Sequence, residues 1–459
     1  MKTFRKEKDF LGEVLIPKNA YYGINSFRAS QNFPISSTKN HKELVKAIAK
    51  VKLSAFKLFR DNKIFEPKIC DAVIKAATEL YNGLFDEHLI VDVFQAGAGT
   101  SLHMNINEII ANRANELLGN PLGSYKPVHP NDTVNYAQST NDVIPTAMRI
   151  AVISVSENLF IAIKELSESF LKKGKQFKNL IKSGRTHLCD ATPITLGDEF
   201  SAYGLTLKKE ASLIKKATKA FYEVGISGTA TGSGINAPVV YKKNIIKYLQ
   251  KETSIGLILN PSLFEAMQNQ GDFAHFMGSL KSFALNMIRI SNDLRLLSSG
   301  PNTGLNEITL PKVQAGSSIM PGKVNPSIPE MLTMVCFYVC GMEETVAMAV
   351  QAGQLELNVM MPIIAHATLS SVEYLTNAVK VMNEKCIKGI EAKEENLKEY
   401  AFKSLGLATI LNPVLGYEKV AELVNQAREQ NKTIIQLIKE KRLLAEKELT
   451  ALINKAIKG

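Results

Sequence analysis

The feature that most constrains the fold is a pair of long stretches in which apolar residues recur at helical spacing. These stretches cover residues 146–173 and 273–299 and contain few residues that break a helix. Between Val152 and Leu166, for example, apolar side chains recur every three or four positions. Such spacing places them on one face of a helix, which must then be buried against other helices. Strand-like alternation is scarce, so the sequence predicts a mainly all-α fold with a central bundle of long helices.

Clusters of helix-breaking residues divide the chain. One cluster, rich in proline and glycine, lies at 120–130 before the first long helix, and the composition changes again near 392–395. A chain of 459 residues with 45% hydrophobic content is large enough for two or three domains. We therefore predict an N-terminal domain (1–141), a central helical bundle (142–396) and a small C-terminal helical domain (397–459) that contains an amphipathic helix at 443–457.

The charge distribution argues against a protein that binds nucleic acid and is compatible with one that acts on a small molecule. The net charge is +11, but the lysines are scattered along predicted helices such as 42–57 and 208–219. A scattered distribution is typical of a solvated surface, whereas nucleic-acid binding needs a concentrated basic patch. We therefore expect no nucleic-acid partner.

Cysteine usage and hydropathy indicate a protein of the cytoplasm. The five cysteines are odd in number and form no CxxC pair, so neither a disulfide framework nor a zinc site is indicated. Residues 1–9 are charged and lack the apolar core of a signal peptide. The longest apolar run, 331–342, is too short to span a bilayer. We expect a cytoplasmic protein with no membrane partner.

The segment Gly316–Pro326, with the sequence GSSIMPGKVNP, carries the most chemistry. Its glycines allow a loop to fold over a ligand and open again. Lys323 offers a positive charge for a carboxylate, and Ser317 and Ser318 offer hydroxyls that could bind a substrate or remove a proton. The alternative interpretation is a loop that caps a helix. At its exit, Ser327 and Glu330 have the spacing of a capping box.

Three further polar clusters are candidate binding segments, each expected in a loop or at a helix end. Gly97–Ser101 could bind an anion, or Thr100 or Ser101 could cap the start of a helix. Gln138–Asp142 could cap the first long helix or gather acceptor oxygens around an ammonium group. Gly184–Asp190 contains His187, which could carry a proton or be structural.

These strings together resemble the aspartase/fumarase superfamily. The match includes the loop Gly316–Pro326, the string Gly-Ala-Gly-Thr-Ser at 97–101 and Gly-Arg-Thr-His at 184–187, and it extends from about Asp9 to about Tyr417. The resemblance implies enzymes that eliminate an amine or water from a succinyl-type substrate to leave fumarate, with no cofactor and no metal. It also implies the three-domain division and a homotetramer whose central helices form one large multi-helix core. Active sites would then be built from several subunits.

The resemblance also implies roles for individual residues. Ser317 would be the catalytic base, and it would need backbone N–H groups and positive charge to stabilise its oxyanion. His187 would be a second catalytic residue, supported by Glu330. Lys323 and Asn325 would hold one carboxylate. The remaining substrate contacts would come from Thr100, Ser139, Thr140, Asn141, Thr186, Ser318 and Met320.

Several segments favour deamination of L-aspartate to fumarate and ammonia. Thr140, Gln354 and the string at 20–23 resemble aspartases, and similar fumarases usually carry Ser and Asn at the first two positions. The alternative is a class II fumarase acting on L-malate, which the strings at 129–132 and 190–193 resemble. A hydratase must protonate its leaving hydroxide, and His187 with Glu330 could do so.

Four positions depart from the family pattern and are not proposed substrate contacts. Met361 stands where relatives usually carry a charged residue, and Asn302 replaces a usual arginine. Thr133 replaces a usual histidine, and Asp198 a usual glutamine.

Overall fold

The computed structural model describes residues 3–449 and 451–452 and is mainly helical, as the apolar periodicity predicted. The chain divides into two compact units. Unit 1 comprises Met1–Phe160, Leu213–Ser282 and Phe337–Tyr374, and unit 2 comprises Ile161–Ser212, Phe283–Cys336 and Leu375–Gly459. The helix predicted for 443–457 extends into residues outside the described part of the chain.

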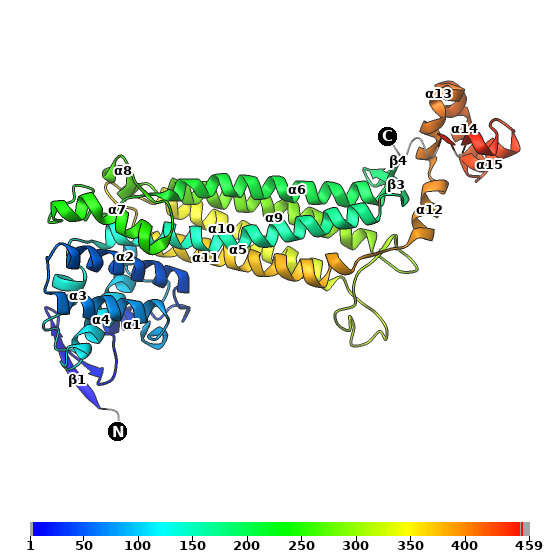
Figure 1. The fold of residues 1–459 in the computed structure, drawn as a ribbon. Coiled ribbons are helices and arrows are strands. Elements are labelled where there is room, and N and C mark those ends of the chain that lie inside the picture. Colours follow the sequence, from blue (N-terminus) through cyan, green and yellow to red (C-terminus); the bar gives the residue numbers. More distant parts are fainter. Residues whose placement is uncertain (1–2, 450, 453–459) are drawn as a thin grey trace. The chain divides into compact units, whose positions relative to one another are not determined.

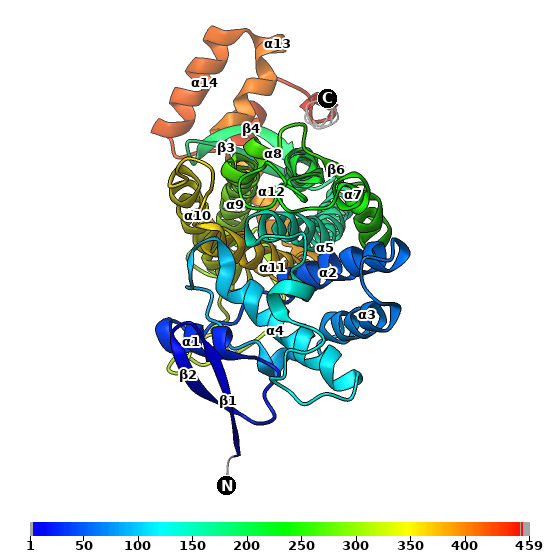
Figure 2. The ribbon, with the colours of Figure 1, turned by 90° about the vertical axis from the view of Figure 1, so that its left-hand side faces the viewer.

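Five long helices contribute segments to both units. The predicted helices at 146–173 and 273–299 are confirmed as α5 and α9. Within each unit the segments of the long helices lie side by side (Figures 1 and 2). In unit 1 the guanidinium of Arg149 on α5 lies 2.8 Å from the carboxylate of Asp272 on α9. In unit 2 the hydroxyl of Tyr203 on α6 donates to Asp293 on α9 over 3.0 Å. The five helices are α5 (Thr140–Gln176), α6 (Leu196–Thr218), α9 (Gly271–Leu297), α10 (Ser327–Gln351) and α11 (Met361–Lys385).

The N-terminal part of unit 1 packs shorter helices around α2. Apolar side chains of α2 at helical spacing, including Leu44, Ile48, Val51 and Leu58, are buried. The carboxylate of Glu108 on α4 accepts the backbone N–H groups of Gly23 and Ser26 and thereby holds the start of α1. The elements here are β1 (Phe4–Asp9), antiparallel to β2 (Gly12–Pro17), α1 (Ile24–Asn32), α2 (Lys42–Asp61), α3 (Pro67–Tyr81), η1 (Asp86–His88), η2 (Gly97–Gly99), α4 (Thr100–Leu117) and the π-helical turn η3 (Pro130–Val134).

Unit 1 also contains a second group of short elements, which follows α6 in the chain. Its two short strands pair in parallel, with Glu223 opposite Ile258. The elements are η4 (Lys219–Tyr222), β5 (Glu223–Val224), α7 (Val239–Thr253), β6 (Ile258–Leu259) and α8 (Leu263–Gln268).

Unit 2 adds two antiparallel strand pairs and a group of C-terminal helices. A local core of buried Leu411, Leu423, Leu437 and Ile438 holds the C-terminal helices together. The elements are β3 (Ile181–Thr186), paired with β4 (Cys189–Thr195), β7 (Ile308–Thr309), paired with β8 (Glu391–Ala392), η5 (Ile387–Gly389), α12 (Glu394–Lys403), η6 (Leu405–Leu411), α13 (Asn412–Leu415), α14 (Tyr417–Glu429) and α15 (Ile434–Glu440).

The predicted domain boundaries fall close to helix starts. The boundary at 141/142 lies in the first turn of α5, which begins at Thr140, and the boundary at 396/397 lies in the first turn of α12. The three-domain division stays a prediction, because the two compact units share the long helices instead of separating at these positions.

Helices α5 and α10 are long and apolar enough to cross a membrane by length and composition alone. In α5, 72% of the most apolar window is buried inside the protein, as expected for the core helix of a bundle. In α10 the share is 28%. The most apolar part of α10 is therefore largely exposed in the single chain.

Candidate active site

The chemically rich segment Gly316–Pro326 forms a closed loop between β7 and α10 in unit 2. The N–H of Gly316 donates to the carbonyl of Lys323 over 2.9 Å, and the Asn325 amide donates back to the Gly316 carbonyl over 2.6 Å. Gly322 adopts a φ of 81°, a left-handed conformation that favours glycine. Asn325 therefore joins the two ends of the loop. The residues between Gly316 and Asn325 form the body of the loop.

The Ser317 hydroxyl lies where two backbone N–H groups converge. Its Oγ accepts hydrogen bonds from the N–H of Ile319 over 3.1 Å and of Met320 over 2.9 Å. These donors stabilise negative charge on the oxygen, because hydrogen bonds to the charged form favour ionisation. Backbone N–H groups of the loop thus reach this hydroxyl, as a role for Ser317 as base would require. Ser318, Met320 and Lys323 are exposed on the same loop.

Glu330 does not form the capping box that its spacing with Ser327 suggested. Helix α10 begins at Ser327 itself, and the buried Ser327 Oγ has no hydrogen-bond partner among the described residues. The Glu330 N–H donates to the Pro326 carbonyl, and its carboxylate lies 3.7 Å from the Arg295 guanidinium. Both of these side chains are about 40% exposed, so the pair contributes little to stability. The Glu330 carboxylate remains accessible.

Thr186 ends the strand β3, whereas His187 lies in the turn of a β-hairpin, in the predicted loop context. Gly184, Arg185 and Thr186 belong to β3, and Thr186 pairs with Cys189 across a two-residue turn. The turn residues His187 and Leu188 have φ values of 56° and 60°, whereas such turns favour Asn and Gly. Bulky side chains are strained in this conformation. Both side chains are exposed, so the hairpin presents His187 to solvent at an energetic cost, which is a feature of functional sites.

Buried charges hold the β3–β4 hairpin in place within unit 2. The fully buried Glu307 carboxylate lies 2.9 Å from the Lys182 ammonium and 2.8 Å from the Arg185 guanidinium. Lys182 also pairs with Glu199 on α6 over 2.9 Å. Two residues of β3 are thereby anchored, and β4 is held by its pairing with β3.

In unit 1, α4 begins at Thr100 without a side-chain cap. The N-cap is Gly99, with a φ of 85°, so the suggested capping by Thr100 or Ser101 is wrong. Thr100 is exposed, and its hydroxyl reaches only the Gly97 carbonyl, 3.5 Å away. The hydroxyl therefore remains available to a ligand at the N-terminus of α4.

The start of α5 is capped by the second polar cluster, and this interpretation is confirmed. Ser139 Oγ accepts the N–H of Asn141 over 3.2 Å, and the Asp142 carboxylate accepts the N–H of Ser139 over 2.9 Å. The Asn141 amide donates to the Ala230 carbonyl over 2.8 Å. Ser139, Thr140 and Asn141 are all partly exposed, so capping does not prevent contact with a ligand.

The N-termini of α4 and α5 converge in unit 1. The His103 imidazole on α4 lies 2.9 Å from the Thr140 hydroxyl, and Gly99 lies so close to Ile144 that a Cβ would meet it at 3.3 Å. Helix N-termini carry partial positive charge and free N–H groups, and both favour an anion. Thr100, Ser139, Thr140 and Asn141 are therefore brought together at a place suited to a carboxylate.

The sequence interpretation missed a fully buried set of polar residues behind this place. Lys52 on α2 and His103 on α4 contact each other over 2.8 Å, and both have 0% exposure. Asp142 is also fully buried and accepts the N–H groups of Ser227 and Thr229, whose φ values are 76° and 54°. The sequence does contain a signal for the burial of Lys52. Lys52 follows Ile48 by four positions and precedes Ala55 by three, which places it on the apolar face of α2.

Most of the departures from the family pattern have local structural roles. The N–H of Thr195 donates to the Asp198 carboxylate, and the N–H of Asp198 donates to the Thr195 hydroxyl, each over 3.0 Å. These two hydrogen bonds cap the start of α6. The Thr133 hydroxyl accepts the N–H of His129 over 3.1 Å. Met361 is fully buried at the start of α11, where a charged side chain would need a partner. Asn302 is exposed, and nothing in the structure explains its substitution.

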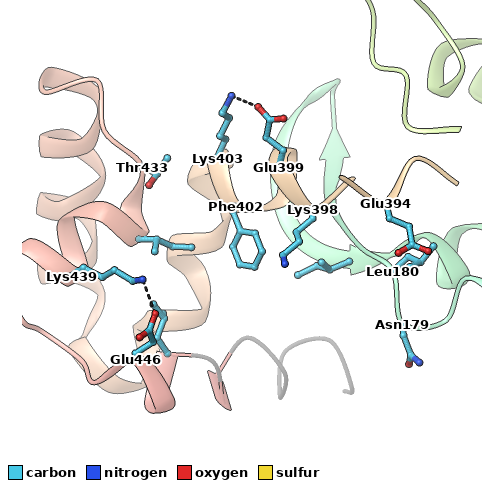
Figure 3. Close-up of a pocket in the computed structure, with 13 residues that line it drawn as sticks. Asn179, Leu180, Glu394, Lys398, Glu399, Phe402, Lys403, Thr433, Lys439 and Glu446 are labelled. Carbon is cyan, nitrogen blue, oxygen red and sulfur yellow. Dashed lines mark hydrogen bonds and ion pairs between the residues drawn. The ribbon is translucent and has the colours of Figure 1, made fainter. Parts of the chain in front are cut away.

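A separate pocket of about 840 Å³ lies in unit 2 between the start of β3 and the C-terminal helices (Figure 3). Lys403 pairs with Glu399, and Lys439 pairs with Glu446, so much of its positive charge is compensated (Figure 3). None of the predicted site residues lines this pocket.

The predicted site residues thus form three sets: the α4 and α5 starts in unit 1, and the His187 hairpin and the Ser317 loop in unit 2. The first offers helix N-termini and hydroxyls for a carboxylate, the second an imidazole, and the third a hydroxyl between N–H donors with an ammonium nearby in sequence. Together they contain the groups needed to remove a proton next to a carboxylate and to stabilise the resulting charge.

Comparison with known proteins agrees with this set of groups. Residues 12–341 match the lyase family, and residues 407–456 match the fumarase C C-terminus. The chain is 43% identical over 453 residues to an aspartate ammonia-lyase of Bacillus subtilis, covering 99% of this chain and 95% of the relative.

Solved structures give the same result. A fumarate lyase:delta crystallin from Brucella melitensis superposes with a TM-score of 0.96 at 44% identity, covering 99% of both chains. A class II fumarase from Schistosoma mansoni gives 0.93 at 33% identity, covering 98% of both chains. The fold and the site groups are those of enzymes that form a double bond by elimination. The chain belongs to the lyase family of the aspartase/fumarase superfamily.

Proposed function

We propose that this protein is an aspartate ammonia-lyase, which reversibly converts L-aspartate to fumarate and ammonia. The observation that carries the proposal is the Ser317 hydroxyl between the N–H groups of Ile319 and Met320, in a loop that also presents Lys323. Full-length similarity to aspartate ammonia-lyases supports the choice of substrate.

The proposed reaction begins with proton removal by Ser317 from the carbon next to one carboxylate. The electron pair spreads into that carboxylate and makes a doubly negative group. Hydroxyl and N–H donors aimed at this group supply much of the stabilisation that such a step needs. In our assignment Thr100, Ser139, Thr140, Thr186, His187 and Ser318 provide these donors.

The second carboxylate and the leaving group complete the assignment. Lys323 and Asn325 hold the second carboxylate and fix the orientation of the substrate. The amine is already protonated in the substrate, so the C–N bond breaks and ammonia departs without a strong acid. No organic cofactor enters the sequence of steps.

A paired ultraviolet assay for fumarate tests the proposal, with L-aspartate in one cuvette and L-malate in the other. Fumarate and ammonia from L-aspartate alone support the lyase. Fumarate from L-malate alone would overturn it in favour of a fumarase, for which the likeness to the Schistosoma mansoni enzyme and an accessible Glu330 are the specific arguments.

We also propose that the active form is a homotetramer with sites built from several subunits. The apolar face of α10 supports this, because Met334, Phe337 and Met348 are 63%, 61% and 57% exposed in the single chain. Such a face needs a cover, and long-helix bundles bury it against further helices. Light scattering on the purified protein tests the mass, and extraction into a membrane fraction would instead indicate that α10 contacts lipid.

We propose a cytoplasmic location. Cys70, Cys189, Cys340 and Cys386 are free thiols, which suits a reducing compartment. Fractionation of cells that produce the protein, followed by the aspartate assay on each fraction, tests this proposal.

A further inference from the structure

A continuous chain of three side chains leads from the core of unit 1 to the partly exposed start of α5. The Lys52 ammonium on α2 lies 2.8 Å from His103 Nε2 on α4, and His103 Nδ1 lies 2.9 Å from the Thr140 hydroxyl on α5. Lys52 and His103 are fully buried, whereas Thr140 is partly exposed. The three residues therefore connect a buried charge with a residue of the proposed substrate site.

The chemistry of these groups gives the chain a direction. A lysine ammonium can only donate hydrogen bonds, so His103 Nε2 must accept. A neutral imidazole whose Nε2 accepts carries its hydrogen on Nδ1, which then donates to Thr140 Oγ. Burial and the neighbouring Lys52 also lower the pKa of His103 well below its usual value, so the imidazole stays neutral. The Thr140 oxygen is thus occupied as an acceptor, and its own hydrogen points elsewhere.

Two neighbours of Lys52 support its charged form, which is present below neutral pH. Its ammonium donates a second hydrogen bond to the Asn135 side chain over 3.1 Å. Burial lowers the pKa of Lys52 to about 7, while the negative charge of Asp142 opposes this effect. The Asp142 oxygens accept three backbone N–H groups, which favour its ionised form against the burial that raises its pKa to about 7. The remaining titratable group in this cluster is Tyr241 on α7, which interacts with Asp142.

We propose that Lys52 and His103 are positioning residues that fix the Thr140 hydroxyl as a hydrogen-bond donor toward a substrate carboxylate. This inference rests on the proposed function, and it deepens the assignment by naming the residues that orient the Thr140 hydroxyl. A hydroxyl that accepts a hydrogen bond from a charged chain becomes a better donor, because successive hydrogen bonds polarise one another. It also loses rotational freedom before the substrate arrives, as preorganised stabilisation requires. Thr140 therefore contacts the developing aci-carboxylate and not the substrate ammonium.

The histidine position offers matched variants. The side-chain amide of asparagine lies where His103 Nδ1 lies, so His103→Asn keeps a donor to Thr140. The amide of glutamine reaches the place of Nε2, so His103→Gln keeps a partner for Lys52 but removes the link to Thr140. We expect His103→Gln to lower kcat by about 10- to 100-fold, with a smaller change in KM, and His103→Asn to recover most of the loss. The constants are measured below neutral pH, where Lys52 is charged.

A double-mutant cycle separates positioning from simple structural support. Thr140→Val removes the hydroxyl, and we expect His103→Gln to cost less than about threefold when added to Thr140→Val, because it acts through the missing group. An undiminished loss in that background would overturn the proposal. Ser54→Ala on α2, whose buried hydroxyl bonds only the Lys50 carbonyl, is the control for disturbing this helix and should leave kcat unchanged.

The hydrogen position on His103 can be read without any activity. Nitrogen-15 NMR of histidine-labelled wild-type protein, with His103→Asn to assign the signal, should show the hydrogen on Nδ1. A hydrogen on Nε2 would overturn the inference even if the enzyme deaminates L-aspartate. An inactive wild type with the hydrogen on Nδ1 would instead count against the proposed function and leave the direction of the chain supported.

Discussion

The Oγ of Ser317 accepts a hydrogen bond from the backbone N–H of Met320 over 2.9 Å, and the N–H of Ile319 donates to the same atom. This arrangement gives a serine hydroxyl some of the environment of an oxyanion hole, since both donors favour the charged oxygen. It also closes a turn of the loop. The functional and the structural consequences of the hydroxyl must therefore be separated by experiment.

We predict that Ser317→Ala lowers kcat for L-aspartate by about 100- to 10,000-fold, the range expected for loss of a general base. Fumarate formation measures the change, and circular dichroism and light scattering check that fold and assembly persist. Ser404→Ala is the matched control, because the Ser404 hydroxyl accepts the N–H of Gly406 over 3.1 Å in a similar turn. Equal losses in both variants would indicate a purely structural role for the Ser317 hydroxyl.

Substitution of Leu188 by Asn is expected to stabilise the protein. Leu188 is 76% exposed and has a φ of 60°, a conformation that Asn adopts at lower cost than Leu. We expect the free energy of unfolding to rise by about 1 kcal/mol and the Tm to rise with it, as differential scanning calorimetry would show. Leu84→Asn is the control, because Leu84 is 62% exposed in a turn without a positive φ. A rise of the same size in both variants would point to a general effect of removing exposed leucines.

Much of the fold follows from the apolar pattern, because a helix face with regular apolar spacing must be buried whatever its partner is. Helices α5 and α9 are the clearest examples, and each begins within six residues of its predicted start. The β3–β4 hairpin was not predicted. Its pairing depends on contacts between strands and on the buried Glu307, which is more than one hundred residues further along the chain.

The candidate site was predicted where its residues form contiguous strings. Ser317, Lys323 and Asn325 share one loop, and Ser139, Thr140 and Asn141 share one helix start. The buried pair of Lys52 and His103 was not predicted, because the contacts of a buried lysine depend on residues that only the fold brings next to it. The cap at the start of α4 was also predicted wrongly, because Gly99 in the αL conformation is the N-cap in place of Thr100 or Ser101. The assigned roles of the site residues remain predictions.

We predict that Tyr241→Phe stabilises the protein by about 1 kcal/mol. Tyr241 is fully buried and packs against Phe59, with ring centroids 5.7 Å apart, but its hydroxyl has no hydrogen-bond partner among the described residues. Removing the hydroxyl eliminates an unpaired buried group without changing the ring. Chemical denaturation monitors the effect. Tyr203→Phe should instead destabilise the protein, because the Tyr203 hydroxyl donates to Asp293 over 3.0 Å.

The stability difference between wild type and Lys52→Met should grow in favour of wild type as pH rises from about 7 to 9. Burial lowers the pKa of Lys52 to about 7, below its usual 10.5, so in this window the unfolded chain binds the proton and the folded chain does not. Stability therefore rises with pH, by at most about 1.4 kcal/mol per pH unit.

Denaturation curves for wild type and Lys52→Met at several pH values test this sign. A constant difference between the two proteins would show that Lys52 keeps its proton throughout the window. Ser54→Ala, which alters another buried polar side chain of α2, involves no titratable group and should give a difference independent of pH.

Phe337→Lys is expected to disrupt the assembly and, with it, the activity. Phe337 is 61% exposed on α10, and a buried, unpaired ammonium in a subunit interface costs several kcal/mol after relaxation. Light scattering should show a mass below four times that of the 50.5 kDa chain, and fumarate formation should fall with the fraction of tetramer. Val239→Lys is the control, since Val239 is 64% exposed at the start of α7 and lies outside the apolar face of α10. If the Phe337 variant were smaller and yet fully active, the active site would be complete within fewer subunits, and the proposal that several subunits build it would be wrong.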